Sequence, residues 1–234
     1  MNKILYTLNN KSVITLIVTI YAISLLLLQI GHYGKIFSRP FRKDFFYTLY
    51  YNSQWVNPES NYGIGDDGLY QVGGLELATK HKFFTIAPEV PPLGQYLYGY
   101  SIQYFGNAEK TSLILFLLSI VLFMLISRQI IKDKVIQAFA ILLLITEPLL
   151  FYQSSVSMLD LPQLTALMVH ILALFWFVKS GYKSTNIKYA IVFAGFGLGA
   201  FISIKIAFFA IAIILADLVV LMIKKKPLIF IVPM

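Results

Sequence analysis

The stretch "SVITLIVTIYAISLLLLQI", residues 12–30, contains no Asp, Glu, Lys or Arg. A helix needs about 20 predominantly apolar residues to cross a bilayer, so this stretch is long enough for one crossing. A cleaved signal peptide would instead have an apolar region of about 7 to 15 residues ending at a small-residue cleavage site, and the sequence offers no such site. The stretch therefore predicts an uncleaved membrane span near the N-terminus.

The composition agrees with a membrane protein. Hydrophobic residues make up 58% of the 234 residues, and the mean hydropathy is +0.75, whereas ordinary soluble domains contain about 45 to 50% apolar residues. The lack of cysteine excludes disulfides, thiolate catalysis and cysteine-ligated metals. The net charge of +8 comes without a basic helix or an RNA-binding signature, so no nucleic-acid partner is expected, and the basic residues are interpreted as topology signals.

Further apolar segments follow the first one. The last apolar region, residues 189–223, contains the single lysine Lys205 and would measure about 52 Å as one helix. Because the hydrocarbon core is about 30 Å thick, this region is expected to form two spans that turn near Lys205. The predicted fold class is all-α, a polytopic transmembrane helical bundle forming a single domain over residues 1–234. The expected spans are residues 12–30, 111–127, 135–152, 161–178, 189–204 and 206–223.

The charges beside these spans predict the orientation. With a cytoplasmic N-terminus, eleven of the nineteen basic residues lie on the cytoplasmic side, with Asp133 as the one acid. An integral multi-pass protein of the cell membrane is therefore expected, or of the endoplasmic reticulum membrane in a eukaryote. The eleven residues are Lys3, Lys11, Arg128, Lys132, Lys134, Lys179, Lys183, Lys188, Lys224, Lys225 and Lys226.

The long external loop, residues 31–110, is expected to be functional and to carry helices on the membrane surface, since long loops without secondary structure are uncommon. In "PPLGQYLYGYSIQYF", Pro91 and Pro92 can open a helix. Apolar and aromatic residues then recur at helical spacing, with tyrosines suited to the headgroup layer. The segment "DFFYTLYYNSQW" is similarly aromatic. The recurring residues are Leu93, Leu97, Tyr100 and Tyr104.

Two adjacent carboxylates, Asp66 and Asp67, lie in the loop sequence "YGIGDDGLYQVGG". Asn, Asp and Gly are common in turns, so a glycine-rich turn is one interpretation. The other is that one carboxylate acts as a general base, because a carboxylate beside a second one at a membrane edge should have a raised proton affinity. A carboxylate pair can also contribute to a divalent-metal site, although hard cations need more than two ligands.

Other polar residues lie beside or within the spans. Asp160 precedes "LPQ" and is either a helix N-cap or a member of a site with Asp66, which lies on the same predicted side. Lys205 either snorkels to the surface or binds a lipid phosphate. His170 is interpreted as a packed, hydrogen-bonded histidine, and Asp217 is expected to reach toward the cytoplasmic lysines.

The order of the motifs resembles a known family. The segments "GDDGLYQVGGLELA", "PEVPPLGQYLYGY", "SSVSMLDLPQ" and "GFGLGAFISIK", which fall between residues 62 and 205, together resemble the GT-C glycosyltransferases of the protein O-mannosyltransferase and aminoarabinose transferase type. The resemblance implies a GT-C fold and transfer of a sugar from a polyprenyl or dolichyl phosphate carrier to a hydroxyl of a protein, lipid or glycan acceptor at the outer or lumenal face.

The resemblance also implies roles for single residues. Asp66 corresponds to the catalytic base of a single inverting displacement, and Asp67 to its acidic partner. Asp160 corresponds to the acid of the "MLDLP" segment, and Lys205 to the lysine that closes the glycine-rich span. No cofactor is firmly implied, and a divalent metal stays open.

The chain departs from the family pattern in three places. Val90 stands where the family has His or Lys before the paired prolines, so the expected substrate contact would have to come from nearby basic residues such as His81, Lys82 or Lys205, with Lys80 as a further choice. Gln95 stands where the mannosyltransferase pattern has Lys. The six expected spans, against ten or more in family members, favour an N-terminal fragment of a longer enzyme. Two alternatives remain, a polytopic transporter and a non-catalytic membrane subunit.

Overall fold

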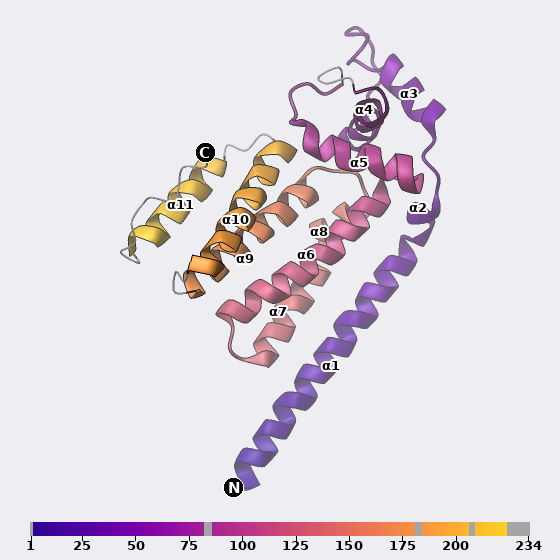
Figure 1. Cartoon of the computed structure of the whole chain (residues 1–234). Helices are drawn as coiled ribbons and strands as arrows, with labels where there is room; N and C mark the ends of the chain where they lie inside the picture. The colour runs from indigo at the N-terminus through magenta and orange to yellow at the C-terminus, as the bar shows by residue number, and fades with distance from the viewer. Residues whose placement is uncertain (1, 82–85, 181–183, 206–208, 224–234) are drawn as a thin grey trace.

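The chain is all-α over the residues that the computed structural model describes, which are 2–81, 86–180, 184–205 and 209–223 (Figure 1). Within these ranges, side chains are described for 10–81, 86–180, 188, 191–192, 194–205 and 209–219. No strand occurs in these ranges, and Ser53 and Tyr62 form an isolated bridge. The helices are α1 (Asn2–His32), α2 (Gly34–Ser38), α3 (Lys43–Asn52), α4 (Asp66–Lys80), α5 (Pro92–Phe105), α6 (Glu109–Ile130), α7 (Lys134–Thr146), α8 (Pro148–Gln153), α9 (Asp160–Lys179), α10 (Ser184–Ile204) and α11 (Phe209–Ile223).

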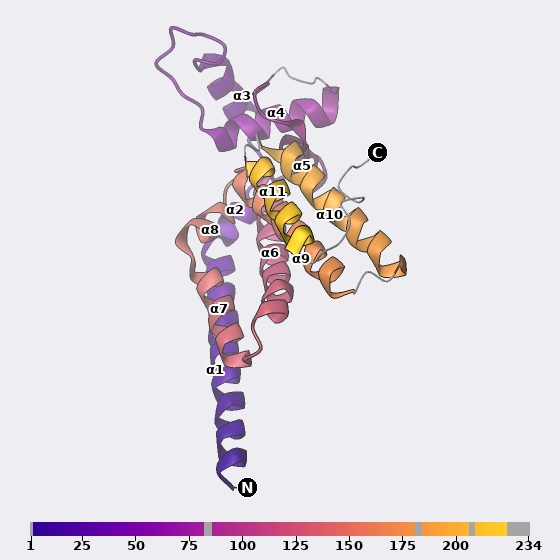
Figure 2. The ribbon, with the colours of Figure 1, turned by 90° about the vertical axis from the view of Figure 1, so that its left-hand side faces the viewer.

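The helices α6, α7, α9 and α10 lie side by side, with α1 along α7 (Figures 1 and 2). They alternate in direction along the chain, and the neighbours α6 and α9 both begin at the same end. The loop helices α2 to α5 gather at one end of these helices, here called the loop end. The opposite end, here called the N-terminal end, holds the start of α1 and the connection between α6 and α7. An ion pair of 2.8 Å between Lys11 Nζ and Asp133 Oδ2 joins α1 to that connection. The basic segment before the first apolar stretch therefore lies at the same end as residues 131–133.

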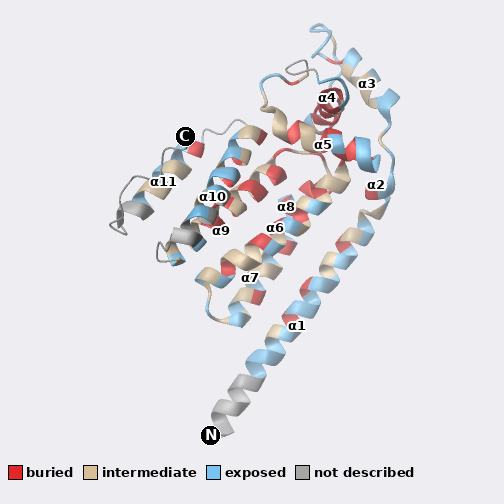
Figure 3. Ribbon diagram, viewed as in Figure 1, coloured by how far each residue is buried: buried red, intermediate tan, exposed pale blue. Residues whose placement is uncertain are grey.

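Among the described residues, three helices are long and apolar enough to cross a membrane: Asn10–His32, Glu109–Ile130 and Asp160–Lys179. The segments Lys134–Thr146, Ala194–Ile204 and Phe209–Val219 are apolar but shorter. Most of α1 from residue 10 onward is exposed, as the pale blue ribbon in Figure 3 shows. A helix that exposes leucine and isoleucine along its length is stable in lipid rather than in water. These findings agree with a membrane protein.

The predicted span 135–152 is not one helix. It is broken between Thr146 and Pro148, because Pro148 has no N–H to continue the helical hydrogen bonds. Glu147 then caps the next helix, accepting a hydrogen bond of 2.5 Å from the backbone N–H of Leu150. The interpretation of a continuous helix was therefore wrong at the glutamate and proline pair.

The aspartate pair begins a helix rather than a turn. Gly65 is the N-cap of α4, and Asp66 and Asp67 occupy its first turn. Carboxylates are favoured there because the helix dipole presents positive charge at its N-terminus. The glycine-rich turn interpretation was therefore wrong, and the fifteen residues that follow Gly65 form a helix.

Helix α5 begins at Pro92 and ends at Phe105, and its C-cap Gly106 has a φ of 68°, a value that glycine adopts at low cost. The predicted apolar and aromatic face of α5 does not lie wholly on the surface, because Leu93 packs against the core. Tyr100 and Tyr104 are exposed and stack on each other with ring centroids 6.1 Å apart.

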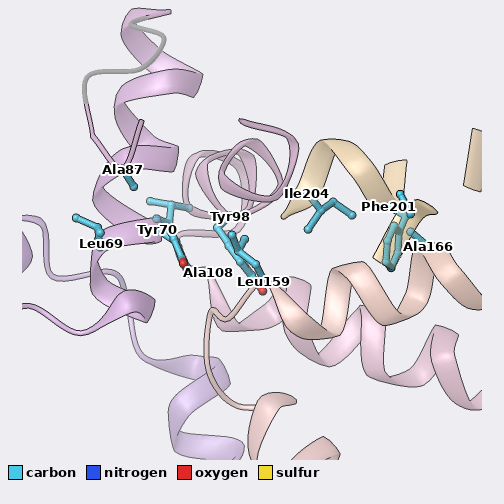
Figure 4. Close-up of a cluster of buried hydrophobic side chains, with 11 residues drawn as sticks. Leu69, Tyr70, Ala87, Tyr98, Ala108, Leu159, Ala166, Phe201 and Ile204 are labelled. Atoms are coloured by element: carbon cyan, nitrogen blue, oxygen red, sulfur yellow. The ribbon is translucent and has the colours of Figure 1, made fainter. Parts of the chain in front are cut away.

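Helices α4 and α5 cross with their backbones in contact. A Cβ atom added to Gly74 would lie 2.8 Å from the backbone nitrogen of Gly99, so only glycine allows the crossing. Beside this crossing, a core cluster joins α4 and α5 to the start of α9 and the end of α10, as Figure 4 shows. The buried residues of this cluster are Leu69, Tyr70, Ala87, Tyr98, Ile102, Ala108, Leu159, Ala166, Phe201, Ile204 and Ala210.

Gly197 fixes the packing of α10 on α9. A Cβ added there would lie 2.7 Å from the backbone nitrogen of His170, whereas a Cβ added at Gly199 meets nothing within 4 Å. We expect Gly197→Ala to destabilise the fold by about 1 to 3 kcal/mol through overpacking. The matched variant Gly199→Ala is expected to be neutral or to stabilise by up to about 1 kcal/mol. Denaturant titration in mild detergent measures both, and equal effects would contradict the close packing.

Candidate functional site

Three carboxylates from three separate segments act electrostatically on one buried tyrosine at the loop end. Tyr70 lies one helical turn after Asp66 on α4. The pKa of Tyr70 is raised to about 12, mainly by burial and then, in decreasing order, by the carboxylates of Asp66, Glu89 and Asp160. Since electrostatic effects weaken with distance, α4, the segment before α5 and the start of α9 each place a carboxylate in the surroundings of Tyr70.

Asp160 also pairs with Lys205. The Nζ of Lys205 lies 2.5 Å from Oδ1 of Asp160, and the two side chains are 41% and 39% exposed. The predicted N-cap role of Asp160 was wrong, because Leu159 is the N-cap of α9. The two residues that were expected on one membrane side are therefore in direct contact, and both keep solvent-accessible surface.

Gly94 of α5 allows this pairing. A Cβ added at Gly94 would run into the side chain of Leu159 and would lie 3.1 Å from Cγ2 of Ile204. Leu159 and Ile204 immediately precede Asp160 and Lys205, and both are buried. The packing of these two apolar side chains against Gly94 therefore brings the charged residues that follow them close together.

The segment that leads into Asp160 is held by side chains of three helices. The Tyr98 hydroxyl of α5 donates to the carbonyl of Met158, and the Ser112 hydroxyl of α6 donates to the carbonyl of Val156 at 2.6 Å. On α4, Nε2 of Gln71 donates to Oγ of Ser157 at 3.1 Å. Asp160 is therefore positioned by α4, α5 and α6 together.

Asp67 faces a different group of residues from Asp66. It lies close enough to Glu109 to interact with it electrostatically, and Glu109 accepts a hydrogen bond of 3.0 Å from Nε2 of Gln71. A Cβ on Gly65 would lie 2.7 Å from Oδ1 of Asp67, so the carboxylate folds back over the N-cap. Consecutive residues of a helix project about 100° apart, which explains why the two aspartates diverge.

Two other basic residues were expected near the site. His81 ends α4 as its C-cap, with a φ of 53°, and is about 20 Å along the helix axis from Asp66 at 1.5 Å per residue. The structure therefore does not bring His81 to Asp66. Lys82 lies outside the described residues. Lys80 forms an ion pair of 2.8 Å with Glu76.

The two positions that depart from the family pattern have structural roles. Val90 packs against the core cluster. Gln95 is 2% exposed, and its Nε2 donates a hydrogen bond of 3.2 Å to the carbonyl of Ala87. Ala87 has a φ of 49°, so Gln95 stabilises an unusual backbone conformation. Among the side chains described, no group of three or more His, Asp or Glu residues is arranged to hold a metal ion.

Sequence reasoning missed two members of the cluster, Tyr70 and Glu89. The spacing of four between Asp66 and Tyr70 indicates a shared helix face, but that signal depends on predicting α4. Nothing in the sequence around Glu89 indicates its neighbours, since Asp160 is far along the chain.

Tyr70 provides a test of the acidic surroundings. Its pKa in the folded chain is about 12, above the ordinary value of 10.0. The unfolded chain therefore loses the phenolic proton first, and the folded state loses stability as the pH rises above about 10, until about 12. We expect Tyr70→Phe to remove this loss. Between about pH 8 and about pH 11, the free energy of unfolding of the variant should rise by about 1 kcal/mol relative to that of the wild type, after allowing for solvent screening. Denaturant titrations at both pH values measure it, and a constant difference between the proteins would contradict it.

Comparisons of the chain with protein-family models, with curated proteins and with solved structures return no match.

Proposed function

We propose that the chain is a membrane glycosyltransferase that moves a sugar from a polyprenyl phosphate carrier to an acceptor hydroxyl. In this proposal the acceptor oxygen attacks the anomeric carbon as its proton passes to the Asp66 carboxylate. The bond from that carbon to the phosphate oxygen breaks, and the lipid phosphate leaves with the bonding electrons. The displacement inverts the anomeric carbon. Because the leaving group already carries charge, positioning and exclusion of water supply much of the rate enhancement.

The observation that carries the proposal is that the ion pair of Asp160 with Lys205 and the exposed Asp66 lie at the same end of apolar helices, and that Asp66 and Asp160 both act on Tyr70. A lipid carrier would reach this place from the bilayer, and an acceptor would reach it from the aqueous side. Asp66 is exposed in the first turn of α4, which is the accessibility that a general base requires.

Lys205 is the group best suited to the donor. Its side chain is 41% exposed and lies at the end of an apolar helix, where a lipid phosphate could accept hydrogen bonds from its ammonium group. Asp160 would hold the ammonium in place before the phosphate arrives. The basic character of the site then comes from one lysine, and its proton-accepting character from Asp66.

The proposal includes a membrane arrangement. The apolar helices α1, α6, α7 with α8, α9, α10 and α11 would each cross the bilayer, with the N-terminus in the cytoplasm and the loop end at the outer or lumenal face. Arg128 and Lys132 lie beside Asp133 in sequence and so belong to the N-terminal end, in agreement with the positive-inside rule. The acids that face Tyr70 are at the other end.

The test uses the purified chain in liposomes. Polyprenyl phosphate hexoses and pentoses, labelled in the sugar, are offered with peptide, lipid or glycan acceptors that carry a hydroxyl. If the chain transfers the sugar, we expect labelled acceptor and an equal amount of free polyprenyl phosphate. Nuclear magnetic resonance of the product should show that the anomeric configuration is inverted. Liposomes without the chain are the control.

Two results would count against the proposal. Solute flux through the chain that needs no polyprenyl phosphate, together with no transfer from any donor, would indicate a transporter. Transfer that appears only with a separate, catalytically complete partner protein would indicate a non-catalytic subunit.

A further inference from the structure

A buried histidine and a carboxylate join three of the apolar helices. His170 lies in the middle of α9 and is 4% exposed. Its Nδ1 lies 3.1 Å from the carbonyl oxygen of Ala194 on α10, and its Nε2 lies 2.9 Å from Oδ2 of Asp217 on α11. Asp217 therefore contacts His170, and the lysines toward which it was expected to reach, residues 224–226, lie outside the described residues.

The partners of His170 fix the number of protons that the pair holds. The carbonyl of Ala194 can only accept, so Nδ1 must carry a hydrogen and donate it. The neutral ring then has a lone pair on Nε2. An ionised Asp217 also offers only lone pairs, so the contact of 2.9 Å is a hydrogen bond only if one further proton lies between the two atoms.

That proton makes the pair neutral overall, whichever atom carries it. A protonated histidine facing an ionised aspartate and a neutral histidine facing a protonated aspartate both have a net charge of zero. Without the proton the pair has a net charge of minus one and two lone pairs in contact. Such a charge is costly among apolar helices, so loss of the proton should separate Asp217 from His170.

Within the part of the chain that the structure describes, the other charged groups of the neighbouring helices lie away from the pair. Asp217 is the sole charged residue of α11, and it is the ionisable side chain that acts on His170 among those described. Helices α5 and α8, which pack on α10 and α9, contribute tyrosines but no charged side chain. The described charged residues of α6, α7, α9 and α10, or directly after α10, lie near helix ends: Glu109, Lys110, Arg128, Lys134, Asp160, Lys179, Lys188 and Lys205.

We infer that His170 and Asp217 form a proton-binding site inside the helical part of the chain, and that one bound proton holds α11 against α9 and α10. The site is separate from the carboxylates at the loop end, and the inference does not depend on sugar transfer. It assigns to the chain a proton-dependent docking of its last described helix.

The absence of cysteine makes the test direct. Val121 on α6 and Leu215 on α11 are 46% and 56% exposed, so cysteines at both positions can be spin-labelled in an otherwise unlabelled chain. Electron–electron distance measurements in nanodiscs are made from about pH 4 to about pH 10, a range that spans histidine titration. The wild-type background should give one narrow distance distribution at low pH that broadens or shifts as the proton is lost.

The variant Asp217→Asn separates proton binding from packing. The asparagine amide can donate to Nε2 while Nδ1 donates to Ala194, so the contact survives without the extra proton. We expect this variant to keep the narrow distribution at every pH. The control Asp133→Asn, at the exposed pair with Lys11, should keep the wild-type transition.

Nitrogen chemical shifts of labelled histidine give a second readout. The chain has three histidines, and His170 is identified by the signal lost in His170→Gln. We expect a hydrogen on Nδ1 throughout the titration and a change at Nε2 that coincides with the distance change. A distance distribution that does not vary with pH in the wild-type background would overturn the inference. So would a transition of the same size in Asp217→Asn, or a His170 ring that carries hydrogen on Nε2 alone.

Discussion

Gly99→Ala is expected to abolish the α4–α5 pair and with it the folded loop end. The added methyl carbon would collide with the carbonyl oxygen of Gly74 and would lie 3.1 Å from Cβ of Ala78. Overpacking against flexible side chains costs about 1 to 3 kcal/mol, and here the obstacle is backbone that cannot rotate away. We therefore expect a loss above about 3 kcal/mol, measured as the free energy of unfolding in mild detergent.

A matched variant distinguishes the collision from the ordinary effect of replacing glycine in a helix. Gly195 of α10 has nothing within 4 Å of an added Cβ, so Gly195→Ala should be neutral or slightly stabilising. Gly74→Ala should lower the free energy of unfolding about as much as Gly99→Ala does. The double variant should lose less than the sum of the two single losses, because both substitutions disrupt the same helix crossing. A stability for Gly99→Ala within about 1 kcal/mol of wild type would contradict the observed crossing.

The positions of the long helices could be predicted from the lengths of the apolar runs. The segments 12–30, 111–127 and 161–178 lie inside α1, α6 and α9, because a run without charge has one stable backbone state in lipid, the helix. Helix α4 could not be predicted in this way. Its sequence contains Gly68, Gly73 and Gly74, which oppose a helix by propensity, and packing against α5 outweighs that preference.

The contact between Asp160 and Lys205 agrees with the prediction that both lie on one side of the chain. A shared side restricts two residues to a layer, but it does not give their separation. The separation depends on Gly94, Leu159 and Ile204, whose packing is a tertiary property. The same limit applies to His170 and Asp217, which are joined only once α11 folds back on α9 and α10.

Asp66→Asn is expected to reduce sugar transfer by about 10²- to 10⁴-fold, the usual contribution of a general base. The fold should survive, because asparagine is tolerated at the start of a helix and the lost interaction with the helix dipole is about 0.3 to 1 kcal/mol. If Asp66 accepts the acceptor proton only as the transition state forms, the loss should appear in kcat with little change in KM.

Asp44→Asn is the matched control for this variant. Asp44 is also an exposed aspartate in the first turn of a loop helix, α3, and is not among the groups that act on Tyr70. Its replacement should leave transfer unchanged. Asp66→Glu should recover part of the activity, because it restores a carboxylate at a slightly different reach.

Transfer by Asp66→Asn at the wild-type rate, with normal expression, would show that another group accepts the proton while leaving the glycosyltransferase assignment intact. If the wild-type chain transfers no sugar from any donor, the glycosyltransferase assignment itself is contradicted. The role of Asp66 can be tested only in a chain that transfers sugar.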